Sequence, residues 1–314
     1  GFIARPLGGI VFGHFGDRVG RKRTLVVALM MMGVATTLIG LLPTYDSIGL
    51  AAPLCLVLLR FIQGLAVGGQ WGGAMLLVTE SAPADKRGWY GAYAQAGAPM
   101  GVILANLAFI SVSASMSDEA FLAWGWRLPF IASILLIAIS LYIQLRMEDT
   151  EAFKALQAEQ AASPQQAVAE RSPVFEAMRR YPRRILLAAG AFLSVQVTFY
   201  ILIAFVIAYG LNSPTVDLTR DELLVSVLVA AAIMMPAQFY FSGLSDRVGR
   251  KQIYRWGAIL TGIWGFAIFP LVDTGMPIMI TLAVTMGMVL LGMQYGPQAA
   301  YFTELFATEV RYSG

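Results

Sequence analysis

The sequence predicts an all-α protein that crosses a membrane several times. Hydrophobic residues make up 58% of its 314 residues and charged residues only 13%, whereas a soluble globular domain carries roughly 25% charged residues. The mean hydropathy is +0.68. Several apolar stretches are about 20 residues long with few or no charges, which is the length that a helix needs to cross roughly 30 Å of hydrocarbon. A membrane β-barrel would instead show short segments of alternating polarity.

Nine membrane-spanning segments are expected, and the first, over residues 2–12, is partial. A polar stretch separates the next four from the last four, which lie at 24–42, 51–78, 90–112, 128–145, 185–211, 223–241, 254–272 and 278–301. The polar stretch is rich in Glu, Gln, Ala and Arg, which is typical of a cytoplasmic linker with some surface helix. We therefore expect an N-terminal bundle, a linker and a C-terminal bundle, over 1–145, 146–184 and 185–314.

The basic residues predict the orientation of these spans. If the loop after the first span is cytoplasmic, 18 of the 22 Lys and Arg residues fall on that side or in the linker. Cytoplasmic loops carry such an excess. Because the chain begins at Gly1 within an apolar run rather than at Met, we expect an internal piece of a longer multi-pass protein of the cell membrane.

Few residues are available for catalytic or metal chemistry. Cys55 is the single cysteine and His14 the single histidine, which excludes an intramolecular disulfide and a Cys-rich or His-pair metal centre. No constellation of paired acids stands out. We therefore expect no enzymatic activity, no metal, no cofactor and no nucleic-acid partner, and we assign no proton-transfer role to His14.

One charged hexapeptide occurs twice. DRVGRK stands at residues 17–22 and again at 246–251, each time between apolar stretches. The chain crosses the membrane six times between the copies, so both face the same side. Repeats of the same sidedness predict two similar halves related by an axis along the membrane normal. Duplication of a six-span unit explains this better than chance.

Several sequence blocks carry a family resemblance. They are ARPLGG (4–9), GHFGDRVGRKR (13–23), RFIQGLAVGGQWGGA (60–74), ESAPADKRGWYG (80–91), AWGWRLPF (123–130), SGLSDRVGRKQ (242–252) and YGPQAAYFTELFATEVRYSG (295–314). Together they resemble the major facilitator superfamily, and within it the metabolite:proton symporter branch, including shikimate-type and uncharacterised metabolite transporters. On this alignment the nine spans correspond to the second to tenth of twelve.

The resemblance implies a fold and a mode of action. Members of the family have two pseudo-symmetric six-helix bundles around a central site and work by alternating access. They import small metabolites, often carboxylates, with a proton, so the proton gradient takes the place of a cofactor. The resemblance also implies a monomer in the cytoplasmic membrane.

The resemblance also implies that both hexapeptides clamp a cytoplasmic gate. In each copy an acid would hold the gate, arginines would form shifting ion pairs, and a glycine would permit a tight turn; the residues are Asp17, Arg18, Gly20, Arg21, Asp246, Arg247, Gly249 and Arg250. Asp246 would face the start of the span near Gly88. The alternative is that DRVGRK serves only as a positive-inside topology signal, and the second copy departs from the pattern with Ser242 in place of Gly13.

Two arginines within spans are the sharpest binding candidates. Burying Arg5 or Arg60 in hydrocarbon costs roughly 2.5–3.5 kcal/mol on insertion scales, so each should face a water-filled cavity, a partner or a substrate. Arg60 shares a helix face with other polar or aromatic residues, Gln63, Gln70 and Trp71. Guanidinium binds carboxylate in a two-pronged geometry, and no acid lies deep in any span. This predicts an anionic substrate, although bonds to backbone carbonyls remain an alternative.

Proton coupling is implied by the resemblance alone. The family often has Glu where this chain has Gln70, and Gln cannot carry a proton. The acids Glu80 and Glu304 lie near cytoplasmic span ends.

Two further spans carry polar faces at helical spacing. Gln196 and Tyr200 lie on one, and Gln294, Gln298 and Tyr301 on the other. Both faces could line the cavity; interhelical hydrogen bonding is the alternative. Closely spaced glycines in a third span, at 64, 68, 69, 72 and 73, predict close helix packing. Gly97, Pro99 and Gly101 indicate either a bendable span or a static kink.

The leading functional hypothesis is a symporter of a small organic anion. A passive facilitator or exchanger of the same fold is the first alternative, because no deep carboxylate is available. A proton symporter of a zwitterion such as proline or betaine is another. A transporter-like sensor would need a signalling domain, and the short linker offers none.

Overall fold

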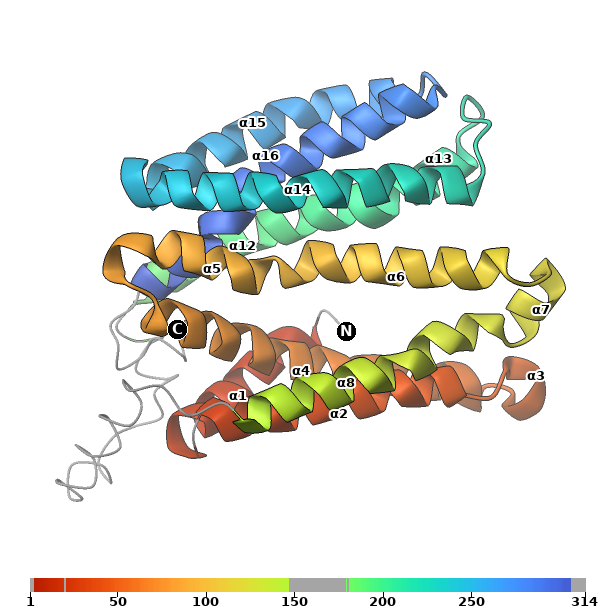
Figure 1. Ribbon diagram of the computed structural model, residues 1–314, viewed down its shortest axis with the longest axis horizontal. Helices are drawn as coiled ribbons and strands as arrows, with labels where there is room; N and C mark the ends of the chain where they lie inside the picture. The colour runs from red at the N-terminus through yellow and green to blue at the C-terminus, as the bar shows by residue number, and fades with distance from the viewer. Residues whose placement is uncertain (1–2, 20, 147–178, 180, 306–314) are drawn as a thin grey trace. The chain divides into compact units, whose positions relative to one another are not determined.

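The structure is a computed structural model that describes residues 3–19, 21–146, 179 and 181–305. Within those residues every regular element is helical. The chain divides into two compact units, each with its own set of packed helices. Figure 1 follows the helices through both units.

The first unit comprises the described residues within Gly1–Ser81 and Ser111–Pro182. Its described helices are α1 (Ala4–Val19), α2 (Arg21–Leu41), α3 (Tyr45–Ile48), α4 (Ala51–Ser81), α7 (Asp118–Ala123), η2 (Gly125–Arg127) and α8 (Leu128–Arg146). Helix α4 packs against α1 and α2, and α8 packs against α2.

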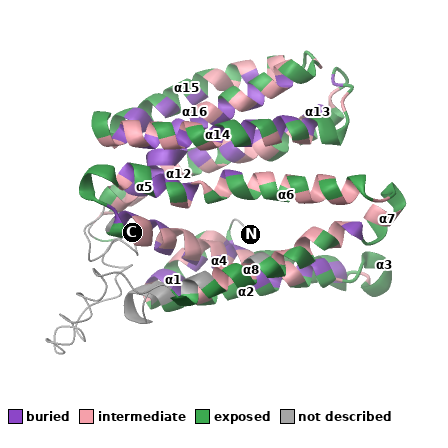
Figure 2. Cartoon of the chain, viewed as in Figure 1, coloured by how far each residue is buried: buried purple, intermediate pink, exposed green. Residues whose placement is uncertain are grey.

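The second unit comprises Ala82–Ile110 and Arg183–Leu305. Its helices are η1 (Ala84–Lys86), α5 (Arg87–Gln95), α6 (Gly97–Ala114), α12 (Pro182–Tyr200), the π-helix η3 (Ile201–Phe205), α13 (Val206–Asn212), α14 (Arg220–Val248), α15 (Arg250–Val272) and α16 (Pro277–Leu305). Helix α16 packs against α14, α15 and α5, and buried residues are concentrated along it (Figure 2). It is the central helix of this unit.

The predicted spans are present. Among the described residues, eight helical segments are long and apolar enough to cross a membrane, and each coincides with one of the eight complete spans expected. Helix α1, with 16 residues, corresponds to the partial first span. The helices extend past the apolar runs; α14 continues to Val248 and so includes Asp246.

The division into units differs from the expected bundle boundary. Residues Ala82–Ile110, expected in the N-terminal bundle, cluster with Arg183–Leu305 instead. The physical reason is that α5 packs against α14 and α16. Apart from its ends, the expected linker lies outside the described residues.

Glycines allow α1 and α4 to approach each other closely. A Cβ atom at Gly68 would overlap the carbonyl oxygen of Arg5, and one at Gly69 would overlap the ring of Phe12, whereas one at Gly72 would meet open space. The predicted close packing is therefore present at Gly68 and Gly69.

A tight turn at Gly249 joins α14 to α15. Gly249 has φ +105°, a conformation that side-chain-bearing residues rarely adopt. The glycine of the second DRVGRK copy thus makes the predicted tight turn. At its other end α14 begins with a capping box, in which the Thr219 hydroxyl accepts from the Glu222 N–H and Glu222 accepts from the Thr219 N–H.

Candidate functional site

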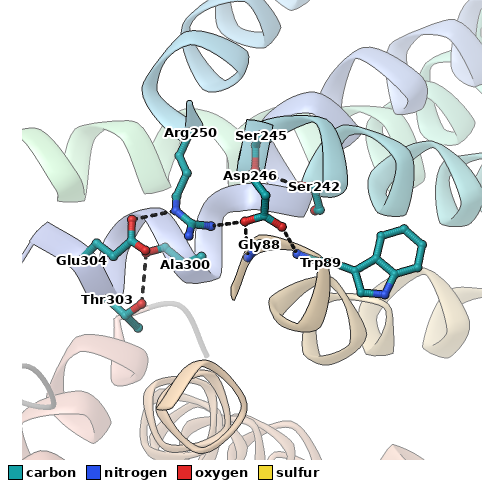
Figure 3. A network of polar contacts seen from close by, with 9 residues as sticks. All are labelled: Gly88, Trp89, Ser242, Ser245, Asp246, Arg250, Ala300, Thr303 and Glu304. Atoms are coloured by element: carbon teal, nitrogen blue, oxygen red, sulfur yellow. Dashed lines mark hydrogen bonds and ion pairs between the residues drawn. The ribbon is translucent and has the colours of Figure 1, made fainter. Parts of the chain in front are cut away.

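The strongest candidate site is a charged junction where four helix ends of the second unit meet. We define it by Gly88, Trp89, Asp246, Arg250 and Glu304, which lie on α5, α14, α15 and α16 (Figure 3). Two of these residues are close in sequence: Asp246 lies in the last turn of α14, and Arg250, which follows the tight turn at Gly249, is the first residue of α15.

Asp246 binds the N-terminus of α5. Its Oδ1 accepts a hydrogen bond from the backbone N–H of Gly88 at 2.8 Å, and its Oδ2 accepts one from the N–H of Trp89 at 2.9 Å. The first N–H groups of a helix lack partners within the helix, and the helix dipole is positive there. Both features favour a carboxylate. The Asp246 side chain is 7% exposed, so these bonds are largely shielded from water.

Arg250 links this carboxylate to a second one. Its Nη1 lies 3.1 Å from Asp246 Oδ1, and its Nε lies 2.6 Å from Glu304 Oε2. The guanidinium is 12% exposed, whereas Glu304 is 39% exposed. The three side chains therefore join α14, α15 and α16 through one partly buried ion-pair chain, with Glu304 at its solvent side.

The junction requires glycine at position 88. A Cβ atom there would lie 2.7 Å from Asp246 Oδ1, 2.9 Å from Arg250 Nη1 and 2.9 Å from the carbonyl oxygen of Ser242. All three distances are shorter than van der Waals contact. Gly88 lets the end of α5 approach α14 closely enough for its N–H to reach the carboxylate.

The other predicted gate residues divide into two groups. Arg247 is exposed and takes no part in the charged junction. The structure does not describe the side chains of Asp17, Arg18 and Arg21, or any part of Gly20. The gate role of the first hexapeptide therefore stays a prediction.

In the first unit, two of the predicted binding residues belong to one hydrogen-bonded chain. Arg60 Nη1 donates to Gln63 Oε1 at 3.3 Å, and Gln63 Nε2 donates to Thr36 Oγ1 of α2 at 2.7 Å. Arg60 itself is exposed. Among the described residues, no carboxylate lies within ion-pair distance of its guanidinium. The other predicted residues of this unit, Arg5, Gln70 and Trp71, are half-buried on α1 and α4.

In the second unit, the predicted glutamines of α16 bond to neighbouring helices. Gln294 Nε2 donates to Thr261 Oγ1 of α15 at 3.1 Å. Gln298 is fully buried and accepts from Gln95 Nε2 of α5 at 3.3 Å. Both are hydrogen bonds between helices, which was the alternative expected for this face. Gln196 and Tyr200 are half-buried on α12.

A cavity of about 350 Å³ lies between α12, α15 and α16. Of the predicted residues only Gln294 lines it, along with polar side chains that sequence reasoning missed, Ser194, Thr198 and Thr261. Ser194 and Thr198 are four residues apart on α12, a spacing that places them on one helix face.

Sequence reasoning also missed two buried glutamines. Gln95 of α5 donates to the carbonyl oxygen of Tyr295 at 2.9 Å as well as to Gln298. Gln238 of α14 is fully buried, and neither atom of its amide has a hydrogen-bond partner among the described residues. Each is a lone polar residue in an apolar run, and this isolation is the sequence feature that could have identified them as candidates.

Comparison with known proteins identifies the family. A family model described as the Major Facilitator Superfamily matches residues 2–314. The chain is 40% identical to a putative metabolite transport protein of Haemophilus influenzae, over 100% of this chain and 70% of that protein. It is 39% identical to the shikimate transporter of Escherichia coli, again over 100% of this chain and 70% of that protein.

Solved structures share the fold. The proton:xylose symporter XylE matches with a TM-score of 0.74 and 18% identity, over 99% of this chain and 72% of that chain. This likeness supports the all-helical architecture of the superfamily. The named relatives are transporters rather than enzymes, in agreement with the prediction from the sequence.

Proposed function

Because the chain belongs to the major facilitator superfamily, we propose that this multi-pass membrane transporter carries a small organic anion together with a proton by alternating access. The observation that carries the proposal is the guanidinium of Arg60. It lies on a span-length apolar helix, is exposed, and has the neutral amide of Gln63 as its described partner. A cation held in this way is available to a carboxylate.

The substrate class draws support from one relative. The shikimate transporter of Escherichia coli is 39% identical to the chain, and shikimate is a carboxylate. We propose Arg60 and Arg5 as the groups that bind the anion, and Gln70, Trp71, Gln196 and Tyr200 as further substrate-binding residues. Gln294 and Gln298 would join them only in a conformation that breaks their bonds to Thr261 and Gln95.

The charged junction is proposed as the gate. In a transporter that alternates, a closed state must be held by contacts that can break. The bonds of Asp246 to the α5 N-terminus are of this kind, because water can replace them when the helices separate. We propose that both DRVGRK loops face the cytoplasm, so that the junction closes the cytoplasmic side.

The test is an uptake screen in cells that express the protein. Radiolabelled shikimate, a dicarboxylate, an aromatic acid, proline and betaine are offered at two external pH values, with and without a protonophore. We expect uptake of at least one carboxylate, faster at the lower pH and lost with the protonophore. Uptake that survives the protonophore would instead indicate a passive facilitator, and uptake of the zwitterions alone would contradict the anionic substrate.

Variants locate the anion site. Arg60→Ala and Arg5→Ala should abolish carboxylate uptake while the protein still reaches the membrane fraction. Arg220→Ala, which removes an exposed guanidinium at the first residue of α14, is the control and should transport normally. Normal uptake by both Arg60→Ala and Arg5→Ala would remove the anion-site proposal.

A further inference from the structure

Three consecutive hydrogen bonds connect the backbone of α2 to the exposed arginine of α4. Thr36 Oγ1 donates to the carbonyl oxygen of Met32 at 2.7 Å. Gln63 Nε2 donates to Thr36 Oγ1 at 2.7 Å, and Arg60 Nη1 donates to Gln63 Oε1 at 3.3 Å. All four residues lie in the first unit.

The direction of each bond follows from the chemistry of the groups. A carbonyl oxygen only accepts, so the single hydroxyl hydrogen of Thr36 is committed to Met32. The hydroxyl can then only accept from Gln63. This requires the NH₂ group of the amide to face Thr36 and turns its carbonyl oxygen toward Arg60.

The orientation of this amide matters for the guanidinium. An amide is nearly symmetric in shape, and rotation by 180° exchanges its donor and acceptor ends. In the reversed orientation Gln63 would present an NH₂ group to the N–H groups of Arg60, and two donors repel each other. The hydroxyl of Thr36 therefore fixes the amide orientation in which Gln63 accepts a hydrogen bond from the guanidinium instead of repelling it.

We infer that Thr36 is a positioning residue for Arg60 and acts through the amide of Gln63. Guanidinium has five N–H donors in a planar fork. The described bond to Gln63 comes from Nη1, which leaves other donors for a two-pronged contact with a carboxylate. A side chain fixed in advance loses less freedom when the anion binds. The role in transport rests on the proposed function; the effect on the guanidinium itself does not.

The matched variants are conservative in shape. Thr36→Val replaces the hydroxyl by a methyl group of similar size and abolishes the bond to Gln63. Thr36→Ser keeps the hydroxyl and should restore the wild-type behaviour. Thr37→Val makes the same chemical change at the next, also half-buried, position of α2 and controls for loss of a hydroxyl from this helix.

The first measurement does not depend on substrate. Protein in membrane vesicles is treated with phenylglyoxal, which reacts with accessible arginine, and the modification rate of Arg60 is followed by mass spectrometry. We expect Thr36→Val to change this rate by at least about threefold, since net hydrogen-bond energies near 1 kcal/mol correspond to factors of this size. Thr36→Ser and Thr37→Val should match the wild type. An unchanged rate in Thr36→Val would overturn the inference.

The second measurement is carboxylate uptake, with shikimate as the probe. Thr36→Val should raise KM roughly three- to tenfold with little change in maximal rate, because only the pre-positioning of the binding group is lost. A purely structural defect would lower the maximal rate and would not be rescued by Thr36→Ser. If the labelling rate responds while Arg60→Ala leaves uptake intact, the positioning stands and the proposed function of Arg60 fails.

Discussion

The carboxylate of Asp246 lies at the N-terminus of α5, where its Oδ1 accepts the backbone N–H of Gly88 at 2.8 Å. The two residues are far apart in sequence and on helices that the expected bundle boundary would separate. Removing the charge of Asp246 should therefore have a clear effect on the stability of the second unit.

Asp246→Asn should weaken the charged junction. The substitution keeps the shape of the side chain but removes the negative charge that attracts Arg250 and the helix dipole, and its NH₂ group cannot accept from an N–H. Hydrogen bonds to charged groups contribute roughly 1.5–3 kcal/mol, so a lower melting temperature in detergent is expected. If the junction is the gate, the maximal uptake rate should fall more than KM rises. Asp217→Asn, an exposed position between α13 and α14, should leave the melting temperature and the uptake kinetics unchanged.

Gly88→Ala should damage the same junction without changing any charge. The new methyl group would lie 2.7 Å from Asp246 Oδ1, and the two helices would have to separate. We expect a loss of thermal stability comparable to that of Asp246→Asn. Gly101→Ala is the matched control, because a Cβ atom there meets open space and alanine within a helix stabilises by roughly 0.5–1 kcal/mol. Equal melting temperatures for Gly88→Ala and Gly101→Ala would contradict the close approach of α5 to α14.

Gln95 and Gln298 should behave as a coupled pair. Gln95→Leu removes the described donor to the buried side-chain oxygen of Gln298, and an unpaired buried group costs roughly 1–3 kcal/mol. Changing both glutamines to leucine should be less harmful than the sum of the single changes, because the Gln298 amide is then no longer left unpaired. Thermal unfolding of the two single variants and the double variant measures the coupling. Strict additivity would argue against the pairing.

Gly68→Ala should separate α1 from α4, whereas Gly72→Ala should be tolerated. A methyl group at position 68 overlaps the carbonyl oxygen of Arg5, which cannot move without the helix, while position 72 faces open space. Both substitutions raise helix propensity equally, so the difference isolates packing. The melting temperature of Gly68→Ala should fall by several degrees relative to Gly72→Ala, and the reverse order would refute the assignment.

Much of the fold could be predicted because the bilayer requires continuous apolar helices of a given length. The apolar runs therefore predict where α2, α4, α14 and α16 lie. The resemblance also predicted that Asp246 faces the start of the span near Gly88, and the hydrogen bond from the Gly88 N–H to Asp246 agrees with this.

The partners of the glutamines could not be predicted in the same way. A polar residue in an apolar run must face a polar partner or water, but the run does not say which helix lies opposite. Gln298 meets Gln95 because α5 packs on α16, and this packing is also why residues 82–110 cluster with the second half of the chain. The relation between Gln63 and Thr36 was missed for the same reason.

The π-helix at Ile201–Phe205 interrupts one membrane-spanning segment, so the helical register after it is offset from the register before it. A π-turn accommodates one residue more than an α-turn, which rotates everything after it by about 100° relative to an uninterrupted α-helix. The face that Gln196 and Tyr200 share therefore cannot be extrapolated past Phe205. Tyr209 lies beyond that offset, where its hydroxyl donates to Asp273 at 2.8 Å. Deleting a single residue from the π-turn would leave an ordinary α-turn with Tyr209 still facing its acceptor, whereas deleting one residue between Phe205 and Tyr209 would rotate this tyrosine away by about 100°.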